Sequence, residues 1–249
     1  MKIYIHGSSG RLGTEVARRV QASELTICSA PQAADCWVLA VPTAAAPDLI
    51  EAAAGRTVID LSGALKQRKE GRLAWLDDDG LLLDGQPPRH GDRLANPGCF
   101  AGSVIVGMTQ ARLVGTLRGA VHVAAVGGRS TAHKSQEGGL RLARRLLDHP
   151  HADEVMASLP GVTVDSFSLM VAYQQPHGIL SVISGRCEAG AVTVAGVEAL
   201  EVGDVLGTPE VRHRLQRDGE RFTLGVVLDN IVFPAENAVR LVRALAILR

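Results

Sequence analysis

Short apolar runs alternate with helical patterns in the N-terminal part of the chain. The runs lie at residues 2–6, 25–29, 36–41 and 57–61. They are nearly continuous in apolar residues, which predicts strands buried on both faces. Helical patterns follow at 14–21 and at 47–54, where Pro47 suits a first helical turn. This order predicts a parallel sheet covered by helices, a Rossmann domain over residues 1–97.

The patterning changes beyond this point and predicts a second, α+β domain over residues 98–229. Helices are expected at 100–113 and 140–147, and a strand at 118–126. Alternating polarity predicts antiparallel strands at 166–173, 178–187 and 222–228. The last segment, 230–249, carries apolar residues at helical spacing, and we expect it to return to the first domain.

A glycine-rich loop joins the first predicted strand to the first predicted helix. Gly7, Gly10 and Gly13 are spaced G-x-x-G-x-x-G. Such a loop combines a tight turn with free N–H groups at a helix N-terminus, which suits a dinucleotide pyrophosphate. A purely structural glycine turn is the alternative. The expected cofactor contacts are Gly7, Ser8, Ser9, Gly10, Arg11, Leu12 and Gly13.

The end of the second predicted strand indicates whether NAD or NADP is the preferred dinucleotide. That strand ends at Ser29-Ala30, without the acidic residue that would hold the ribose 2′-hydroxyl of NAD. The pattern therefore favours NADP. Arg11 is a candidate for the 2′-phosphate, and a solvated surface arginine is an equally good reading.

Composition excludes several classes of protein. Lys plus Arg and Asp plus Glu number 26 each, which argues against a nucleic-acid binder or a membrane-surface binder. No apolar run is long enough to span a bilayer, and the N-terminus lacks a signal-peptide pattern. The four cysteines form no C-x-x-C pair. We therefore expect a cytoplasmic protein.

Cys99 differs in context from the other cysteines. It follows Pro97-Gly98 and precedes an apolar helical segment. A thiol at a helix N-terminus has a lowered pKa, so Cys99 is the candidate nucleophile. The remaining three fall in apolar strands and are expected to be buried and inert: Cys28, Cys36 and Cys187.

The cysteine motif Asn-Pro-Gly-Cys-Phe at 96–100 resembles the nucleophile motif of N-acetyl-γ-glutamyl-phosphate reductases. Further segments resemble that family in the same order: 7–13, 58–62, 149–155, 178–180 and 228–230. The resemblance implies NADPH-dependent reduction of an acyl phosphate to a semialdehyde through a cysteine thioester. It also implies a small-molecule substrate, a homodimer or homotetramer, and cofactor contacts from Ser62 and Asn230.

The chain departs from the family pattern at several positions. Gly102 stands where the family usually has threonine, and Pro150 and Asp153 replace an arginine and a proline. Residues 231–234 read Ile-Val-Phe-Pro, without the usual Lys-Gly pair, and the chain is shorter than is typical. These differences concern the identity of the substrate more than the chemistry.

Three histidines are candidates for the general acid or base, because imidazole exchanges protons near neutral pH. His149 ranks first by its place in the motif, His151 second and His177 third. Arg129, Lys134 and Arg141 are candidates for holding a phosphate or carboxylate, and a solvated basic face is the alternative. The pair His149-x-His151 lacks a third ligand at a regular spacing, so no metal is expected.

Three alternatives to the leading function stay open. Aspartate-semialdehyde dehydrogenases share the architecture and the thiol chemistry. A reductase of a modified or carrier-bound acyl phosphate, in lysine, arginine or secondary metabolism, is the second. The third is a non-catalytic NADP-binding regulator, against which the intact Cys99 turn argues.

Overall fold

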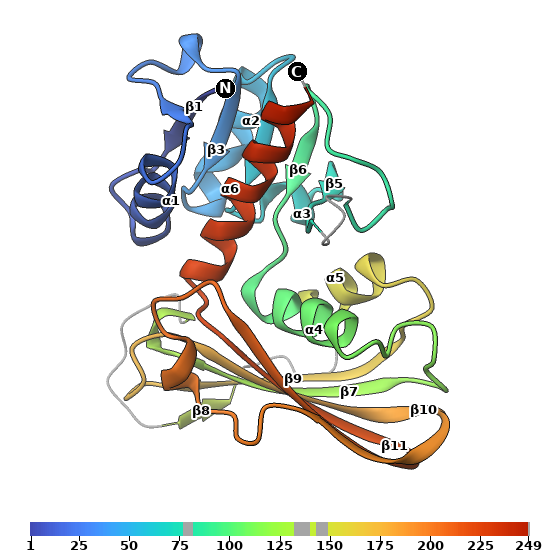
Figure 1. Cartoon of the computed structure of the whole chain (residues 1–249). Coiled ribbons are helices and arrows are strands. Elements are labelled where there is room, and N and C mark those ends of the chain that lie inside the picture. Colours follow the sequence, from blue (N-terminus) through green and yellow to red (C-terminus); the bar gives the residue numbers. More distant parts are fainter. Residues whose placement is uncertain (77–81, 132–139, 143–148, 249) are drawn as a thin grey trace. The chain divides into compact units, whose positions relative to one another are not determined.

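The computed structural model describes residues 1–76, 82–131, 140–142 and 149–248 (Figure 1). The chain divides into two compact units. Unit 1 comprises Met1–Gly98 and Pro234–Arg249, and unit 2 comprises Cys99–Phe233. Unit 2 is therefore a continuous segment inserted between the two parts of unit 1.

Unit 1 is built on a six-stranded sheet in which every pair of neighbours is parallel. Its strands lie in the order β2-β1-β3-β4-β6-β5. Their bounds are β1 Lys2–His6, β2 Thr26–Ile27, β3 Cys36–Leu39, β4 Thr57–Asp60, β5 Arg72–Leu73 and β6 Arg93–Ala95. The Rossmann-like sheet expected from the continuous apolar runs is confirmed, and its carboxyl edge collects the loops that follow β1, β4 and β6.

Helices cover both faces of this sheet. Helices α1 (Arg11–Gln21) and α6 (Val232–Ile247) pack over the face that carries Ile3 and Ile5. Helices α2 (Ala46–Ala52) and α3 (Ala64–Gln67) cover the opposite face. Short 3₁₀ turns, η1 (Pro31–Ala33) and η2 (Thr43–Ala45), complete the connections of unit 1. The C-terminal helix thus supplies part of the core of the N-terminal sheet.

Unit 2 is a five-stranded sheet in the order β11-β10-β7-β9-β8. Its strands are β7 Val121–Gly128, β8 Leu140–Leu142, β9 Val164–Ala172, β10 Ile179–Gly196 and β11 Val211–Leu228. Helices α4 (Cys99–Gln110) and α5 (Pro150–Ser158) pack on one face of the sheet (Figure 1). Two 3₁₀ turns, η3 (Arg129–Thr131) and η4 (Val202–Val205), join its strands.

Two details of unit 2 differ from the sequence prediction. The sheet is mixed, because β7 and β9 pair in parallel while the other neighbours are antiparallel. The predicted helix over 140–147 is wrong at its start, where Leu140–Leu142 pairs with β9 as strand β8. The rest of that segment lies outside the described residues. Strand alternation reports which face is buried and carries no information on the direction of the partner strand.

No helix among the described residues combines the length and apolar character needed to cross a membrane.

Candidate active site

The glycine loop of unit 1 turns sharply at the end of β1. Gly7 has φ of +80°, and a Cβ there would clash with the carbonyl oxygen of Ala40. A Cβ at Gly13 would clash with the carbonyl oxygen of Gly7. The N–H of Gly10 closes the turn by donating to that same oxygen at 3.0 Å. Only glycine at positions 7 and 13 permits this close approach of β1 and α1.

The amino end of α1 is suited to an anion. Gly10 is its N-cap residue, so no side chain caps the first turn, and that turn contains no acidic residue. Ser8, Ser9 and Arg11 are exposed, and Leu12 is half-buried. The helix therefore presents uncapped N–H groups and the positive end of its dipole, a cradle that fits a dinucleotide pyrophosphate. No acidic residue follows β2, where the chain continues with Cys28-Ser29.

Ser62 lies at the same carboxyl edge of the sheet, just after β4. Its N–H and its hydroxyl both donate to the Oδ1 of Asp60, which is fully buried. The Oδ2 of Asp60 accepts from the N–H of Leu65 in α3. Asp60 thus builds the turn between β4 and α3. The hydroxyl of Ser62, the predicted cofactor contact, already donates a hydrogen bond within that turn.

Cys99 is the first residue of α4 in unit 2. It is half-buried, whereas the following residues of the helix are buried through Met108. The adjacent Phe100 is 6% exposed and packs against β7, where a Cβ at Gly127 would lie 2.7 Å from the Phe100 Cζ. The helix is thereby anchored in the core of unit 2, with the cysteine at its amino end.

His149 and His151 lie beside this segment but have different contacts. His149 is the N-cap of α5, and its Nδ1 accepts the N–H of His151 at 3.3 Å. Its ring stacks on Phe167 with 5.9 Å between centroids. The His151 ring also lies near Phe167, with 6.0 Å between centroids, and it meets Phe100 edge-on, with 5.6 Å between centroids. His151 therefore contacts the residue next to Cys99.

His177 lies in a separate polar cluster of unit 2. Its Nδ1 is 3.1 Å from Oδ2 of Asp229, a carboxylate that is fully buried. The same carboxylate accepts N–H groups from Gly207, Ile231 and Val232. A Cβ at Gly128 would lie 2.7 Å from the His177 backbone, whereas a Cβ at the preceding Gly127 would lie 2.7 Å from the Phe100 ring.

Asn230 belongs to the same cluster. Its Oδ1 accepts the N–H of Gly178 at 2.6 Å, and its Nδ2 donates to the Ser130 hydroxyl at 3.0 Å. These bonds tie the start of β10 and the 3₁₀ turn η3 to the end of β11. Asn230 therefore has a structural role within unit 2.

The remaining sequence candidates are placed as follows. Arg129 is exposed in η3, the side chain of Arg141 is not described, and Lys134 lies outside the described residues. Cys36 and Cys187 are buried as expected, but Cys28 follows β2 and is half-buried, so the expectation of a buried thiol there is wrong. The described residues contain no cluster of three or more His, Cys, Asp or Glu side chains suited to hold a metal ion.

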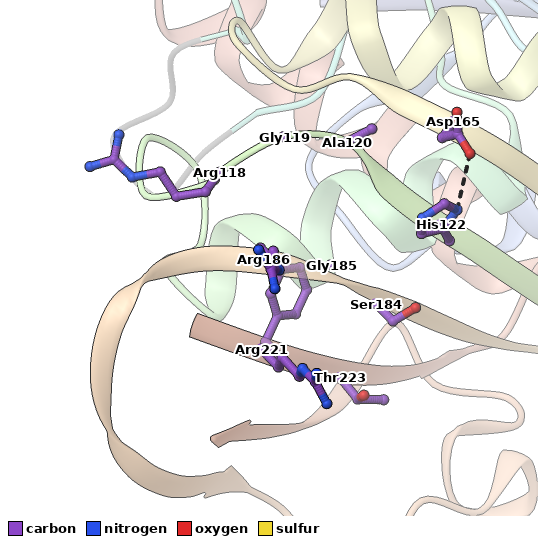
Figure 2. Close-up of a pocket in the computed structure, with 11 residues that line it drawn as sticks. Arg118, Gly119, Ala120, His122, Asp165, Ser184, Gly185, Arg186, Arg221 and Thr223 are labelled. Atoms are coloured by element: carbon purple, nitrogen blue, oxygen red, sulfur yellow. Dashed lines mark ion pairs between the residues drawn. The ribbon is translucent and has the colours of Figure 1, made fainter. Parts of the chain in front are cut away.

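A pocket of unit 2 lies apart from all of these candidates. Figure 2 shows it beside β7, β10 and β11, where His122 pairs with Asp165 at 3.4 Å. Three arginines also line it: Arg118, Arg186 and Arg221. None of the predicted site residues lines this pocket, so it is not a candidate for the reaction.

Two buried polar residues, Asp229 and Asn237, are not among the site residues predicted from the sequence. Asp229 lies inside a motif whose predicted contact is Asn230, and Asn237 lies in the apolar C-terminal helix. The available signal was a polar residue beside an otherwise apolar run, since such a residue must find hydrogen-bond partners inside the protein.

The parallel sheet of unit 1 and the mixed sheet of unit 2 give the chain the fold of solved semialdehyde dehydrogenases. A probable aspartate-semialdehyde dehydrogenase from Pseudomonas aeruginosa superposes with a TM-score of 0.70 at 16% identity, covering 98% of this chain and 97% of that one. Aspartate semialdehyde dehydrogenase II from Vibrio cholerae, in complex with ASA, gives 0.66 at 16% identity, covering 98% of each chain.

Sequence comparison narrows the class to one family. N-acetyl-γ-glutamyl-phosphate reductase of Chlorobaculum tepidum is 31% identical over 245 residues, covering 86% of this chain and 71% of the relative. The chain belongs to the N-acetyl-γ-glutamyl-phosphate reductase family, which confirms the resemblance read from its motifs. No family model matches the chain.

Proposed function

We propose that this protein reduces an acyl phosphate of the N-acetyl-γ-glutamyl phosphate type to its semialdehyde, with NADPH as the reductant and Cys99 as the nucleophile. The observation that carries the proposal is the position of Cys99. In a chain of this family, it is the half-buried first residue of a helix whose next turns are buried.

The residues of unit 2 supply the covalent chemistry. The Cys99 thiolate attacks the acyl carbon, a carbon–sulfur bond forms, and phosphate leaves with the electron pair of the carbon–oxygen bond. NADPH, when bound, supplies the hydride that reduces the thioester. His151 donates a proton to the resulting thiohemiacetal oxygen and then removes it, so that the carbon–sulfur bond breaks and the aldehyde is released.

The contacts of the histidines support His151 over His149 as this acid and base. The Nδ1 of His149 is used to cap α5 and its ring stacks on Phe167. His151 contacts Phe100, the neighbour of the nucleophile. His177 remains a third candidate, with one of its ring nitrogens 3.1 Å from the buried carboxylate of Asp229.

The loop Gly7–Gly13 and the start of α1 support NADPH binding. The uncapped helix terminus holds the pyrophosphate, and Arg11 is the proposed contact of the 2′-phosphate. Ser62 and Asn230 complete the proposed cofactor contacts. We also propose that the protein is cytoplasmic, because all four of its cysteines are free thiols, as is usual in a reducing compartment. A homodimer or homotetramer is proposed because relatives of this kind are often oligomeric.

Assay of the reverse reaction tests the proposed substrate. Purified protein is mixed with NADP, inorganic phosphate and a panel of semialdehydes, and NADPH formation is followed at 340 nm. The proposal expects phosphate-dependent turnover of N-acetyl-glutamate semialdehyde. Preferential turnover of aspartate semialdehyde would assign the activity named in the structural neighbours. Tight NADPH binding without turnover of any substrate would favour a regulator.

A further inference from the structure

Two buried carboxamides meet just before the nucleophile. Asn96 is 4% exposed and Asn237, on α6, is 1% exposed. The Nδ2 of Asn237 donates to Oδ1 of Asn96 at 2.6 Å and to the carbonyl oxygen of Ala74 at 2.7 Å. One side chain of α6 therefore links the ends of β5 and β6, and all of these groups belong to unit 1.

Asn96 is held through its backbone as well. Its N–H donates to the carbonyl oxygen of Asp60 at 3.0 Å, which extends the pairing of β4 with β6 by one residue. Beyond Asn96 the chain contains only Pro97 and Gly98 before Cys99. Residue 96 is thus the last position before the nucleophile at which the sheet of unit 1 fixes both the backbone and the side chain.

Packing alone does not account for an asparagine at position 237. Several of its neighbours on α6 are apolar and almost completely buried, among them Ala238, Leu241 and Val242. The Oδ1 of Asn237 is itself buried and accepts no hydrogen bond from the described residues. Burying an amide is unfavourable unless its hydrogen bonds compensate, and a leucine would fill a similar volume without that cost. The two bonds donated by Nδ2 are what this side chain contributes.

We infer that Asn237 is a positioning residue for the reaction: through Asn96 it fixes the Pro97-Gly98 turn that delivers Cys99 to the start of α4. The inference rests on the function proposed above. Asn237 touches neither substrate nor cofactor in this role. Displacing a nucleophile by about 1 Å costs on the order of 100-fold in rate, so a small loosening of this turn is enough to affect turnover.

The main readout of the test measures the thiol directly and needs no substrate. In a Cys28→Ser background, which removes the other accessible thiol, iodoacetamide alkylation of Cys99 is followed from pH 6 to pH 9 by peptide mass spectrometry. We expect Asn237→Leu to move the pH of half-maximal alkylation upward and to lower kcat about 10-fold or more, with Asn237→Gln recovering part of both.

The matched control is Thr57→Val. Thr57 is another buried polar residue of unit 1, and its hydroxyl accepts the N–H of Gly91 at 2.9 Å, away from the turn. This variant loses a comparable hydrogen bond and is expected to keep the wild-type alkylation profile. If Asn237→Leu does not fold by circular dichroism, Asn237→Ser replaces it, since serine retains one donor and a small volume.

The outcomes separate the two proposals. An alkylation profile that is identical in wild type and the folded Asn237 variants overturns the positioning role. A profile shift that Thr57→Val reproduces overturns it as well, because general destabilisation then explains the effect. Wild-type protein that turns over no acyl phosphate refutes the proposed function, while the alkylation profiles still report on the turn.

Discussion

At the scale of single residues, the four cysteines have distinct surroundings. Cys36 and Cys187 are fully buried, and burial raises the pKa of the Cys36 thiol well above its ordinary value. Cys28 is half-buried after β2, with its thiol 3.7 Å from the carbonyl oxygen of Ala33. Only Cys99 combines partial exposure with the amino end of a long helix, so reactivity and catalysis are expected there.

Replacing Cys99 with serine should preserve the fold and abolish turnover. The two side chains have nearly the same volume, and a serine hydroxyl at this position has no comparable activation. We expect unchanged circular dichroism and NADPH affinity, with kcat reduced by about 1,000-fold or more. The measurements are fluorescence titration with NADPH and the phosphate-dependent assay. A Cys99→Ser variant with appreciable activity would refute the covalent mechanism.

Asparagine substitutions can distinguish the roles of His149 and His151. His149→Asn keeps a good N-cap for α5, so stability and turnover should change little. His151→Asn removes the proposed acid and base and should lower kcat by about 100- to 10,000-fold. Both variants are compared by kcat and by urea denaturation. The reverse result, loss of activity only in His149→Asn, would restore the ranking that the motif alone suggests.

At the scale of elements, two departures from the family pattern lie close together. Gly102, in the first turns of α4, replaces the usual threonine, and Phe233, in α6, lies in the segment that replaces the usual Lys-Gly pair. A Cβ at Gly102 would lie 2.9 Å from the Phe233 ring, which is 3% exposed. The ring therefore occupies space that a side chain at position 102 would need.

This packing predicts a coupled pair of substitutions. Gly102→Ala alone overpacks the contact and should lower the free energy of unfolding by about 1–3 kcal/mol, even though alanine favours helix. Combining it with Phe233→Leu should remove most of that loss, because the smaller side chain relieves the clash. A double-mutant cycle tests this: the free energy of unfolding is measured by urea denaturation for the wild type, both single variants and the double variant. Strictly additive effects would show that the two positions do not interact.

The sequence predicts some elements better than others, for physical reasons. Strands β3 and β4 are continuous apolar runs, so their existence is readable, although the structure ends each one or two residues earlier. The order of strands and the parallel pairing of β7 with β9 depend on partners distant in sequence. The candidate site likewise contains features that a local sequence pattern predicts and features that depend on distant contacts. A motif marks Cys99, whereas the roles of Asp229 and Asn237 depend on contacts that only the folded chain creates.

At the scale of the whole molecule, the cofactor preference can be tested without knowing the substrate. NADPH should bind at least about 10-fold more tightly than NADH, because no acidic residue follows β2 to hold a free 2′-hydroxyl. Arg11→Ala should reduce the ratio of NADPH affinity to NADH affinity, mainly by weakening NADPH binding. Lys2→Ala, at the far end of β1 from the loop, should leave this ratio unchanged. Both affinities are measured by fluorescence titration. Tighter binding of NADH would contradict the assignment.

The discontinuity of unit 1 has a consequence for how the chain is made. Its sheet emerges from the ribosome early, yet α6, which covers Ile3 and Ile5, follows only after all of Cys99–Phe233 has been synthesised. At translation rates of about 5–20 residues per second, the apolar face of the sheet stays without α6 for on the order of ten seconds. Unit 2, which is continuous, can close first. The nascent N-terminal sheet is thus a natural client for chaperones, and a chain that stops before Pro234 leaves that face exposed to aggregation.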